Sequence, residues 1–170
     1  MQEIDRLEKD QHYMKIALDL AKRGIARVSP NPLVGAVIVK DDQIIGKGYH
    51  EKYGGLHAER NAIKDYKNRA INDPNLTIEG ATMYVTLEPC CHYGKTPPCT
   101  EAIIENKIKR VVVASLDPNP LVAGKGVKIL EEVGIEVDIG VLKDEADRQN
   151  RIFRHYIINK RPLVTMKYAM

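Results

Sequence analysis

All three cysteines of this 170-residue chain lie in one ten-residue segment, from Cys90 to Cys99. The preceding residues, 82–87, are mostly β-branched, aromatic or aliphatic and predict a strand, whereas Pro97 and Pro98 suit the first turn of a helix. The cysteines therefore lie where a strand passes into a helix. Unpaired N–H groups at a helix N-terminus favour a thiolate, which is expected here at Cys99. Because thiolates bind metals, the segment predicts a metal site.

A histidine and a glutamate upstream are candidates to complete this site. Glu59 begins a helical pattern with apolar residues three, four and seven positions later, so its carboxyl group is expected on the buried face. A buried carboxylate needs a partner or a function. His57 can converge with Glu59 only from a non-helical entry turn, which the preceding Gly54-Gly55 permits. A surface His–Glu pair at a helix start explains this triplet equally well, but the cysteine cluster favours the metal site.

Together these residues match the zinc-deaminase pattern of His-x-Glu followed by Pro-Cys and a further cysteine. The matching segments are His57-Ala58-Glu59, Pro89-Cys90 and Cys99. Eight residues separate the two cysteines, instead of two in the common pattern. With this longer loop, the chain resembles the deaminase domain of the bifunctional riboflavin-biosynthesis deaminase/reductase family. The resemblance extends from about residue 13 to residue 170 and includes segments 31–35, 48–50, 86–90 and 117–124.

The resemblance implies a catalytic zinc ion held by His57, Cys90 and Cys99, with Glu59 as the general base and acid. One histidine and two cysteines leave the fourth position of a tetrahedral ion for water, and two thiolates cancel its charge. A base beside the site then becomes more necessary. Glu59 is expected to take a proton from the zinc-activated water and to return protons to the ring nitrogen and to departing ammonia.

Spacing alone does not distinguish Cys90 from Cys91 as the first cysteine ligand. The Pro-Cys pair of the deaminase signature favours Cys90, and the family has a serine-like residue at the next position. Adjacent residues leaving a strand also point to opposite sides, so Cys91 is expected to face away from the ion.

The resemblance further implies the substrate 2,5-diamino-6-ribosylamino-4(3H)-pyrimidinone 5′-phosphate, deaminated at C2. Without it, the residues indicate only a hydrolytic deaminase of an amino-substituted ring. By similarity, the substrate-binding residues are Asn31, His50, His92, Lys95, Asp117 and Asn119. Lys95 also lies in a Gly-Lys-Thr loop before a helix start, which can attract a phosphate, although a solvated loop lysine is an alternative. His50 and His92 are equally consistent with ordinary loop histidines.

Two other classes of function remain open. In the first, His57 and all three cysteines form a closed structural zinc site in an interaction module. That site has no use for Glu59, and the adjacent cysteines would chelate one ion awkwardly. In the second, the chain deaminates nucleic-acid bases, which calls for an aromatic-lined basic channel and the shorter cysteine spacing. One Phe and no Trp are present, although there are eight Tyr.

The alternation of strands with helices predicts an α/β layer sandwich with a partly parallel sheet. The family resemblance implies a three-layer α/β/α sandwich with a mixed sheet, as in cytidine deaminases. Predicted helices are 10–23, capped by Asp10, then 57–67, 100–107, 126–133 and 144–160, the last with Ala146, Ile152, Phe153 and Ile157 among its apolar positions. Predicted strands are 34–40 and 44–49, joined by a hairpin at Asp41-Asp42, then 82–87, a buried strand 111–115 and an edge strand 135–139.

Residues 1–160 are predicted to form a zinc-dependent deaminase domain. Residues 161–170 resemble the first strand of the family's reductase domain, which is otherwise absent, so NADP-dependent reduction is expected only in a longer chain.

Composition indicates a soluble globular protein, with 44% hydrophobic and 29% charged residues. A net charge of +3 spread along the chain gives no indication of nucleic-acid binding. No apolar run approaches the ~20 residues of a membrane span, and residues 1–10 have no apolar signal segment. The odd, clustered cysteines favour a reducing compartment, so a cytoplasmic protein is expected. The family resemblance implies a small-molecule substrate and a homo-oligomer.

Overall fold

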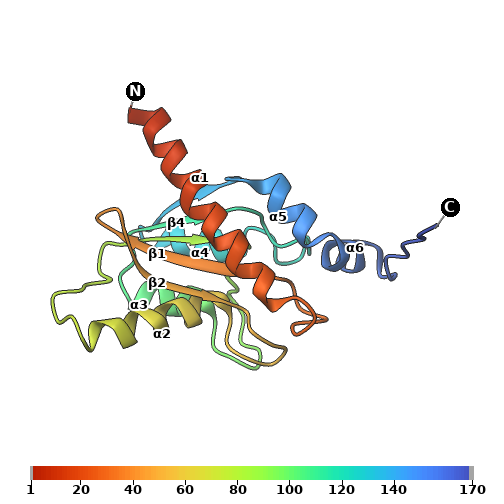
Figure 1. Cartoon of the computed structure of the whole chain (residues 1–170), viewed down its shortest axis with the longest axis horizontal. Helices are drawn as coiled ribbons and strands as arrows, with labels where there is room; N and C mark the ends of the chain where they lie inside the picture. Colours follow the sequence, from red (N-terminus) through yellow and green to blue (C-terminus); the bar gives the residue numbers. More distant parts are fainter. Residues whose placement is uncertain (1, 169–170) are drawn as a thin grey trace.

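The computed structural model describes residues 2–168, and its elements alternate between helices and strands (Figure 1). The helices are α1 (Gln2–Ala21), the 3-10 turn η1 (Lys22–Gly24), α2 (Ala58–Ala70), α3 (Cys99–Glu105), α4 (Lys125–Glu132), α5 (Lys143–Gln149) and α6 (Arg151–Asn159). The strands are β1 (Gly35–Lys40), β2 (Gln43–Tyr49), β3 (Thr82–Val85), β4 (Arg110–Val113) and β5 (Glu136–Ile139).

The five strands form one mixed sheet in the order β2-β1-β3-β4-β5. β1 pairs antiparallel with β2 and β3, whereas β3, β4 and β5 run parallel. The hairpin turn lies at Asp41 and Asp42, as predicted, with φ of 50° and 60°. β5 is the predicted edge strand, and Val111, Val112 and Val113 of β4 are buried. The sheet is therefore partly parallel, as expected.

Helices cover both faces of the sheet, which gives the predicted three layers (Figure 1). Strand side chains alternate between two apolar cores. Val111 and Val113 of β4 face the core that includes residues of α2, α3 and α4, whereas Val112 faces the core that includes residues of α1 and α5. The sheet thus separates two hydrophobic layers.

Gly35 and Gly48 let helices approach the antiparallel hairpin closely. A Cβ at Gly35 would lie 1.9 Å from Ala17 O in α1, and one at Gly48 would lie 2.4 Å from Ala62 N in α2. Neither contact leaves room for a methyl group, because both involve backbone atoms. The two glycines therefore set how closely α1 and α2 pack on the sheet.

Gly35→Ala is expected to lower the free energy of unfolding by about 1–3 kcal/mol, because α1 or β1 must shift to admit the methyl group. Urea denaturation followed by circular dichroism measures this loss. Gly94→Ala is the matched control, since a Cβ there meets no atom within 4 Å. Equal stability of the two variants would show that α1 does not need this close approach.

Asp10 does not cap a helix, contrary to the sequence prediction. α1 begins eight residues earlier, at Gln2, because residues 2–9 contain no glycine or proline to stop it. The Asp10 side chain is buried and pairs with both terminal nitrogens of Arg110, at 2.8 and 2.6 Å, and with the hydroxyl of Tyr84 at 2.9 Å. Arg110 also binds Asp138 of β5. This group ties α1 to the parallel half of the sheet.

Arg110→Met is expected to lower the free energy of unfolding by about 3–5 kcal/mol, because Asp10 would keep a buried and largely uncompensated charge. Lys109→Met, at an exposed neighbouring position, is the control for the loss of one cation. In the Asp10→Leu/Arg110→Met double variant the unpaired charge is gone, so it should be more stable than Arg110→Met alone. A single variant within about 1 kcal/mol of the wild type would contradict this account.

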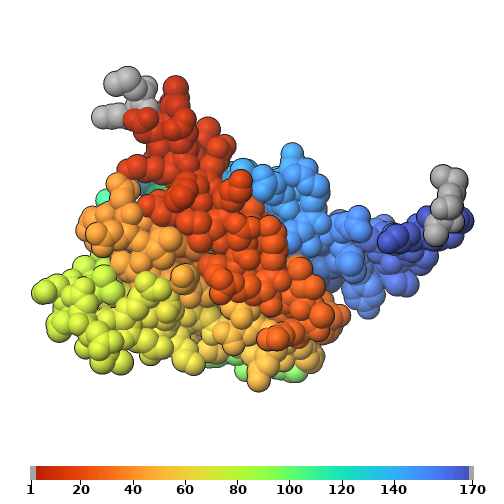
Figure 2. All heavy atoms as spheres, viewed as in Figure 1, coloured from red at the N-terminus to blue at the C-terminus, as the bar shows by residue number. Residues whose placement is uncertain are grey.

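The predicted helix 144–160 is wrong as one element, because the chain bends at Asn150 between α5 and α6. Asn150 has φ −102° and ψ 20°, and its buried side chain pairs with Leu33 in both directions. Its Oδ1 accepts from Leu33 N and its Nδ2 donates to Leu33 O, both at 2.8 Å. α6 then runs outward from the body (Figures 1 and 2).

Residues 161–168 form no strand, and residues 169–170 of the predicted strand lie outside the described residues. The proposed domain boundary at residue 160 stays a prediction. Among the described helices, none combines the length and apolar character needed to cross a membrane.

Candidate active site

His57, Cys90 and Cys99 converge at one end of the sheet. His57 is the N-cap of α2 with extended φ and ψ of −71° and 163°, Cys90 follows β3, and Cys99 is the first residue of α3. His57 Nδ1 lies 3.4 Å from Cys90 Sγ and 3.5 Å from Cys99 Sγ, and the three ligand atoms lie within 4.8 Å of one another. Tetrahedral zinc, with Zn–S of about 2.3 Å and Zn–N of about 2.0–2.1 Å, places sulfur and nitrogen about 3.5 Å apart. The donor set and its spacing fit zinc.

The N-terminus of α3 donates a hydrogen bond to Cys90. The sequence predicted instead that this helix end would favour a thiolate at Cys99. Cys99 N donates to Cys90 Sγ at 3.3 Å. A hydrogen bond from the Cys99 thiol and the proximity of His57 lower the pKa of Cys90 to about 4. Cys99 in turn has its pKa raised, because it donates to Cys90 and is buried. These hydrogen bonds favour a thiolate at Cys90 over one at Cys99.

Glu59 is buried beside this cluster, on the face predicted from its helical pattern. Burial raises the pKa of Glu59 to about 7, and the negative charge of Cys90 acts in the same direction. Such a carboxyl group can accept and return a proton near neutral pH. Because Glu59 lies two residues after His57, its carboxyl group is next to the metal-ligand atoms.

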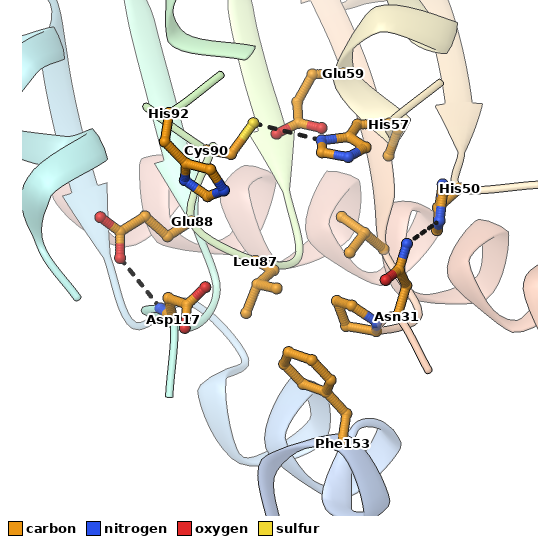
Figure 3. Close-up of a pocket in the computed structure, with 13 residues that line it drawn as sticks. Asn31, His50, His57, Glu59, Leu87, Glu88, Cys90, His92, Asp117 and Phe153 are labelled. Carbon is orange, nitrogen blue, oxygen red and sulfur yellow. Dashed lines mark hydrogen bonds between the residues drawn. The ribbon is translucent and has the colours of Figure 1, made fainter. Parts of the chain in front are cut away.

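The cluster opens into a cavity of about 290 Å³ (Figure 3). Seven predicted site residues line it, namely Asn31, His50, His57, Glu59, Cys90, His92 and Asp117. An adjoining cavity of about 230 Å³ shares Asn31, His57, Cys90 and His92 and adds Lys95. The structure thus brings nine of the ten predicted site residues to the metal cluster or to the cavities beside it.

Asn119 lines neither cavity. Its Oδ1 accepts a hydrogen bond from Leu121 N at 3.1 Å, and its backbone N–H donates to Asp117 Oδ1 at 2.8 Å. These contacts shape the loop around Asp117. A direct role of Asn119 in substrate binding stays a prediction.

His50 lies beside Asn31 in the cavity wall and is joined to it by a hydrogen bond (Figure 3). His50 Nδ1 lies 3.0 Å from Leu56 O, so this nitrogen carries the proton and Nε2 accepts from Asn31 Nδ2 at 3.1 Å. Burial lowers the pKa of His50, which keeps the ring neutral. One of the two N–H groups of the Asn31 amide is thereby used, and its Oδ1 is left as an acceptor for a ligand.

Phe153 and Glu88 are among the cavity residues for which the sequence predicted no site role. Phe153 of α6 faces the cavity from the side opposite the metal cluster (Figure 3). It was expected only as an apolar position of a helix, and no local pattern marks it as a cavity residue. Arg154 holds this helix through Asp147 at 3.1 Å and Ser115 Oγ at 3.2 Å.

Cys91 does not belong to the group of possible metal ligands found among residues 2–168. It lines a small hollow with Val122 and Gly126. This geometry does not favour the closed four-ligand site. The assignment of Cys91 as a bystander stays a prediction.

Comparisons with known proteins agree with this geometry. Residues 7–115 match the family model of the cytidine and deoxycytidylate deaminase zinc-binding region. The riboflavin biosynthesis protein RibD of Actinobacillus pleuropneumoniae is 55% identical over 161 residues, which cover 95% of this chain and 41% of the relative. The diaminohydroxyphosphoribosylamino-pyrimidine deaminase of Buchnera aphidicola is 49% identical over 145 residues, which cover 85% of this chain and 93% of that protein.

A solved structure has the same fold. The deaminase/reductase of Thermotoga maritima superposes with a TM-score of 0.86 at 48% identity, over 92% of this chain and 43% of that protein. The chain thus spans about two fifths of the RibD relatives, but nearly the full length of the Buchnera deaminase. It belongs to the zinc-binding cytidine and deoxycytidylate deaminase family and, within it, to the deaminases of riboflavin biosynthesis.

Proposed function

We propose that this deaminase hydrolyses 2,5-diamino-6-ribosylamino-4(3H)-pyrimidinone 5′-phosphate at C2, giving 5-amino-6-ribosylamino-uracil 5′-phosphate and ammonia. The observation that carries the proposal is the buried Glu59 carboxyl group beside His57, Cys90 and Cys99, in a cavity of about 290 Å³. The name of the Buchnera relative, which matches over 93% of its length, supports this substrate.

In the proposed reaction, four residues have distinct roles: three metal ligands and one proton-transfer group. His57, Cys90 and Cys99 would hold zinc, which supplies a Lewis acid that makes water a stronger nucleophile near neutral pH. Glu59 accepts a proton from the attacking water and delivers it to the ring nitrogen. It then takes the remaining proton of the added hydroxyl and passes it to the amine, which leaves as ammonia while the C=O bond forms. Burial of Glu59 keeps these transfers away from bulk solvent.

Asn31 and Phe153 are proposed to orient the pyrimidine ring. The Oδ1 of Asn31 can accept a hydrogen bond from a ring or exocyclic N–H, because its Nδ2 already bonds to His50. Phe153 and Leu87 supply apolar surface on the cavity wall for the flat faces of the ring.

Lys95 is proposed to bind the 5′-phosphate. It is exposed in the adjoining cavity, where its Nζ lies 4.2 Å from the centre of the Tyr53 ring. This cation–π contact holds the ammonium group near Gly54-Gly55, which precede His57 in the chain and line the same cavity.

Lys95→Met is expected to raise KM for the ribotide by about tenfold with little change in kcat, because the phosphate lies away from the reacting carbon. Activity on the dephosphorylated riboside should not change. Lys64→Met on the exposed side of α2 is the control. A KM unchanged by Lys95→Met would place the phosphate elsewhere.

Ammonia release tests the proposed function directly. The zinc-loaded chain is assayed with the diaminopyrimidine ribotide, and cytidine and a single-stranded oligonucleotide serve as comparison substrates. The ribotide should be strongly preferred over both. Activity confined to cytidine or the oligonucleotide would overturn the substrate assignment.

We also propose that residues 1–160 form the deaminase domain, that residues 161–170 correspond to the start of the reductase part of the longer relatives, and that the chain acts as a cytoplasmic homo-oligomer. The name of the Thermotoga relative, a deaminase/reductase matched over 43% of its length, supports the second point. Light scattering after size exclusion measures the oligomeric state, and a monomeric mass would contradict that part.

A further inference from the structure

Glu88 makes an unusual set of hydrogen bonds in the wall of the cavity. The residue is buried, follows β3 and lies two positions before Cys90. Its Oε2 accepts from Asp117 N at 3.1 Å and Gly124 N at 3.0 Å, and its Oε1 accepts from Gly126 N at 2.9 Å and Val127 N at 3.4 Å. One side chain thus holds four backbone N–H groups.

This arrangement uses both oxygens of the Glu88 carboxyl group as acceptors. Two carboxylate oxygens offer about four acceptor positions and no donor, whereas a glutamine would turn an NH₂ group toward some of the same N–H groups. Three of the four donors lie at the start of α4, whose N-cap Gly124 has no side chain to cap it. The negative charge of Glu88 therefore caps this helix from another part of the chain and meets its positive end.

Gly126 lets α4 approach the segment that carries Cys90. A Cβ at Gly126 would lie 2.2 Å from Pro89 O and 3.3 Å from Glu88 Oε1. The start of α4 therefore rests directly on the Glu88-Pro89 backbone. Any displacement of this contact moves the segment 117–127 relative to the metal ligands.

Asp117 connects this anchor to the cavity (Figure 3). Its N–H is held by Glu88, and its Oδ1 accepts from Asn119 N. Within residues 2–168, no hydrogen-bond partner is recorded for its Oδ2. One oxygen of Asp117 is thus available to a ligand in a cavity that Glu88 also lines.

We propose that Glu88 is a positioning residue for substrate binding, which fixes Asp117 in the cavity by holding its backbone and the N-terminus of α4 against the metal-ligand segment. The effect on substrate rests on the proposed function, since it assumes that the cavity binds the ribotide. The hydrogen-bond anchor itself does not depend on the identity of the substrate.

Hydrogen exchange of the wild-type chain provides the first test. The N–H groups of Gly124 and Gly126 lie at a helix start and have no carbonyl acceptor among the described backbone bonds, so Glu88 is their source of protection. Both amides should exchange at least about tenfold more slowly than the amide of Gly54, which is exposed and has no acceptor among the described hydrogen bonds. Exchange as fast as that of Gly54 would overturn the anchor without any variant.

Kinetics of Glu88→Gln provide the second test. KM for the ribotide should rise by about tenfold while kcat stays within about threefold and zinc content is unchanged. A merely structural role would reduce the fraction of active enzyme, which lowers apparent kcat and leaves KM unchanged. Glu131→Gln, exposed on α4, is the control for loss of one negative charge.

A double-mutant cycle tests whether Glu88 acts through Asp117. Both changes are expected to disturb the same contact, the one between the Asp117 carboxyl group and the substrate. The double variant Glu88→Gln/Asp117→Asn should therefore raise KM no more than the larger single change does. Multiplication of the two single effects would overturn the link.

If Glu88→Gln does not fold, the wild-type exchange and Glu88→Asp, which keeps the charge but shortens the reach, decide the question. If the wild-type chain shows no ribotide turnover, the proposed function fails and the exchange result alone decides whether Glu88 anchors the segment.

Discussion

Glu59→Gln is expected to reduce kcat by about 10²- to 10⁴-fold while zinc content and thermal stability are retained. The amide has nearly the same shape as the carboxyl group but cannot accept the proton of the attacking water. Glu59 handles several proton transfers in the proposed reaction, so the loss should lie in kcat and not in KM. Ammonia release and metal analysis of the same preparation measure both quantities.

Glu105→Gln is the matched control for this experiment, because it makes the same chemical change at an exposed position near the end of α3. Its rate should equal that of the wild type. A Glu59→Gln variant that kept more than about a tenth of the wild-type rate would show that another group carries the proton.

Cys90→Ser is expected to lose zinc almost completely, whereas Cys91→Ser should keep about one zinc ion per chain and near-normal activity. Cys90 Sγ lies 3.4 Å from His57 Nδ1 and accepts the N–H of Cys99 at 3.3 Å. Its loss removes a ligand and also the acceptor at the start of α3. Cys91 has neither contact and is not among the residues that line the two cavities beside the metal cluster.

The two cysteine variants form a matched pair, because they make the same change at adjacent residues. Metal analysis by mass spectrometry after dialysis gives the zinc content of each. If Cys91→Ser were empty and Cys90→Ser loaded, the ligand assignment would be wrong and the loop would shift by one residue.

The sequence was informative where local patterns decide the structure. The Asp41-Asp42 turn and the buried strand β4 follow from turn chemistry and apolar runs, and the structure has both. The zinc-deaminase pattern predicted that His57, Cys90 and Cys99 converge, which they do, whereas spacing alone left Cys91 as an alternative to Cys90. The helix pattern also placed Glu59 on a buried face, where it lies.

The sequence was uninformative where contacts between distant residues decide. Asp10 has the residue type of a helix cap, but its partner Arg110 lies 100 residues away and allows it to be buried within α1. Asn150 interrupts a continuous helical pattern because it pairs with Leu33, 117 residues earlier. Phe153 enters the cavity for the same reason, since the bend directs α6. Periodicity carries no information on such partners.

The pairing of Asn150 with Leu33 has a consequence for ligand selection. Leu33 lies between cavity residues Pro32 and Val34, and Asn150 directly precedes the helix that carries Phe153. Two hydrogen bonds of 2.8 Å therefore join two walls of the cavity, one from each half of the chain. The spacing between the Phe153 wall and the wall formed by residues 32–34 therefore depends on a pairing that lies outside the cavity lining itself.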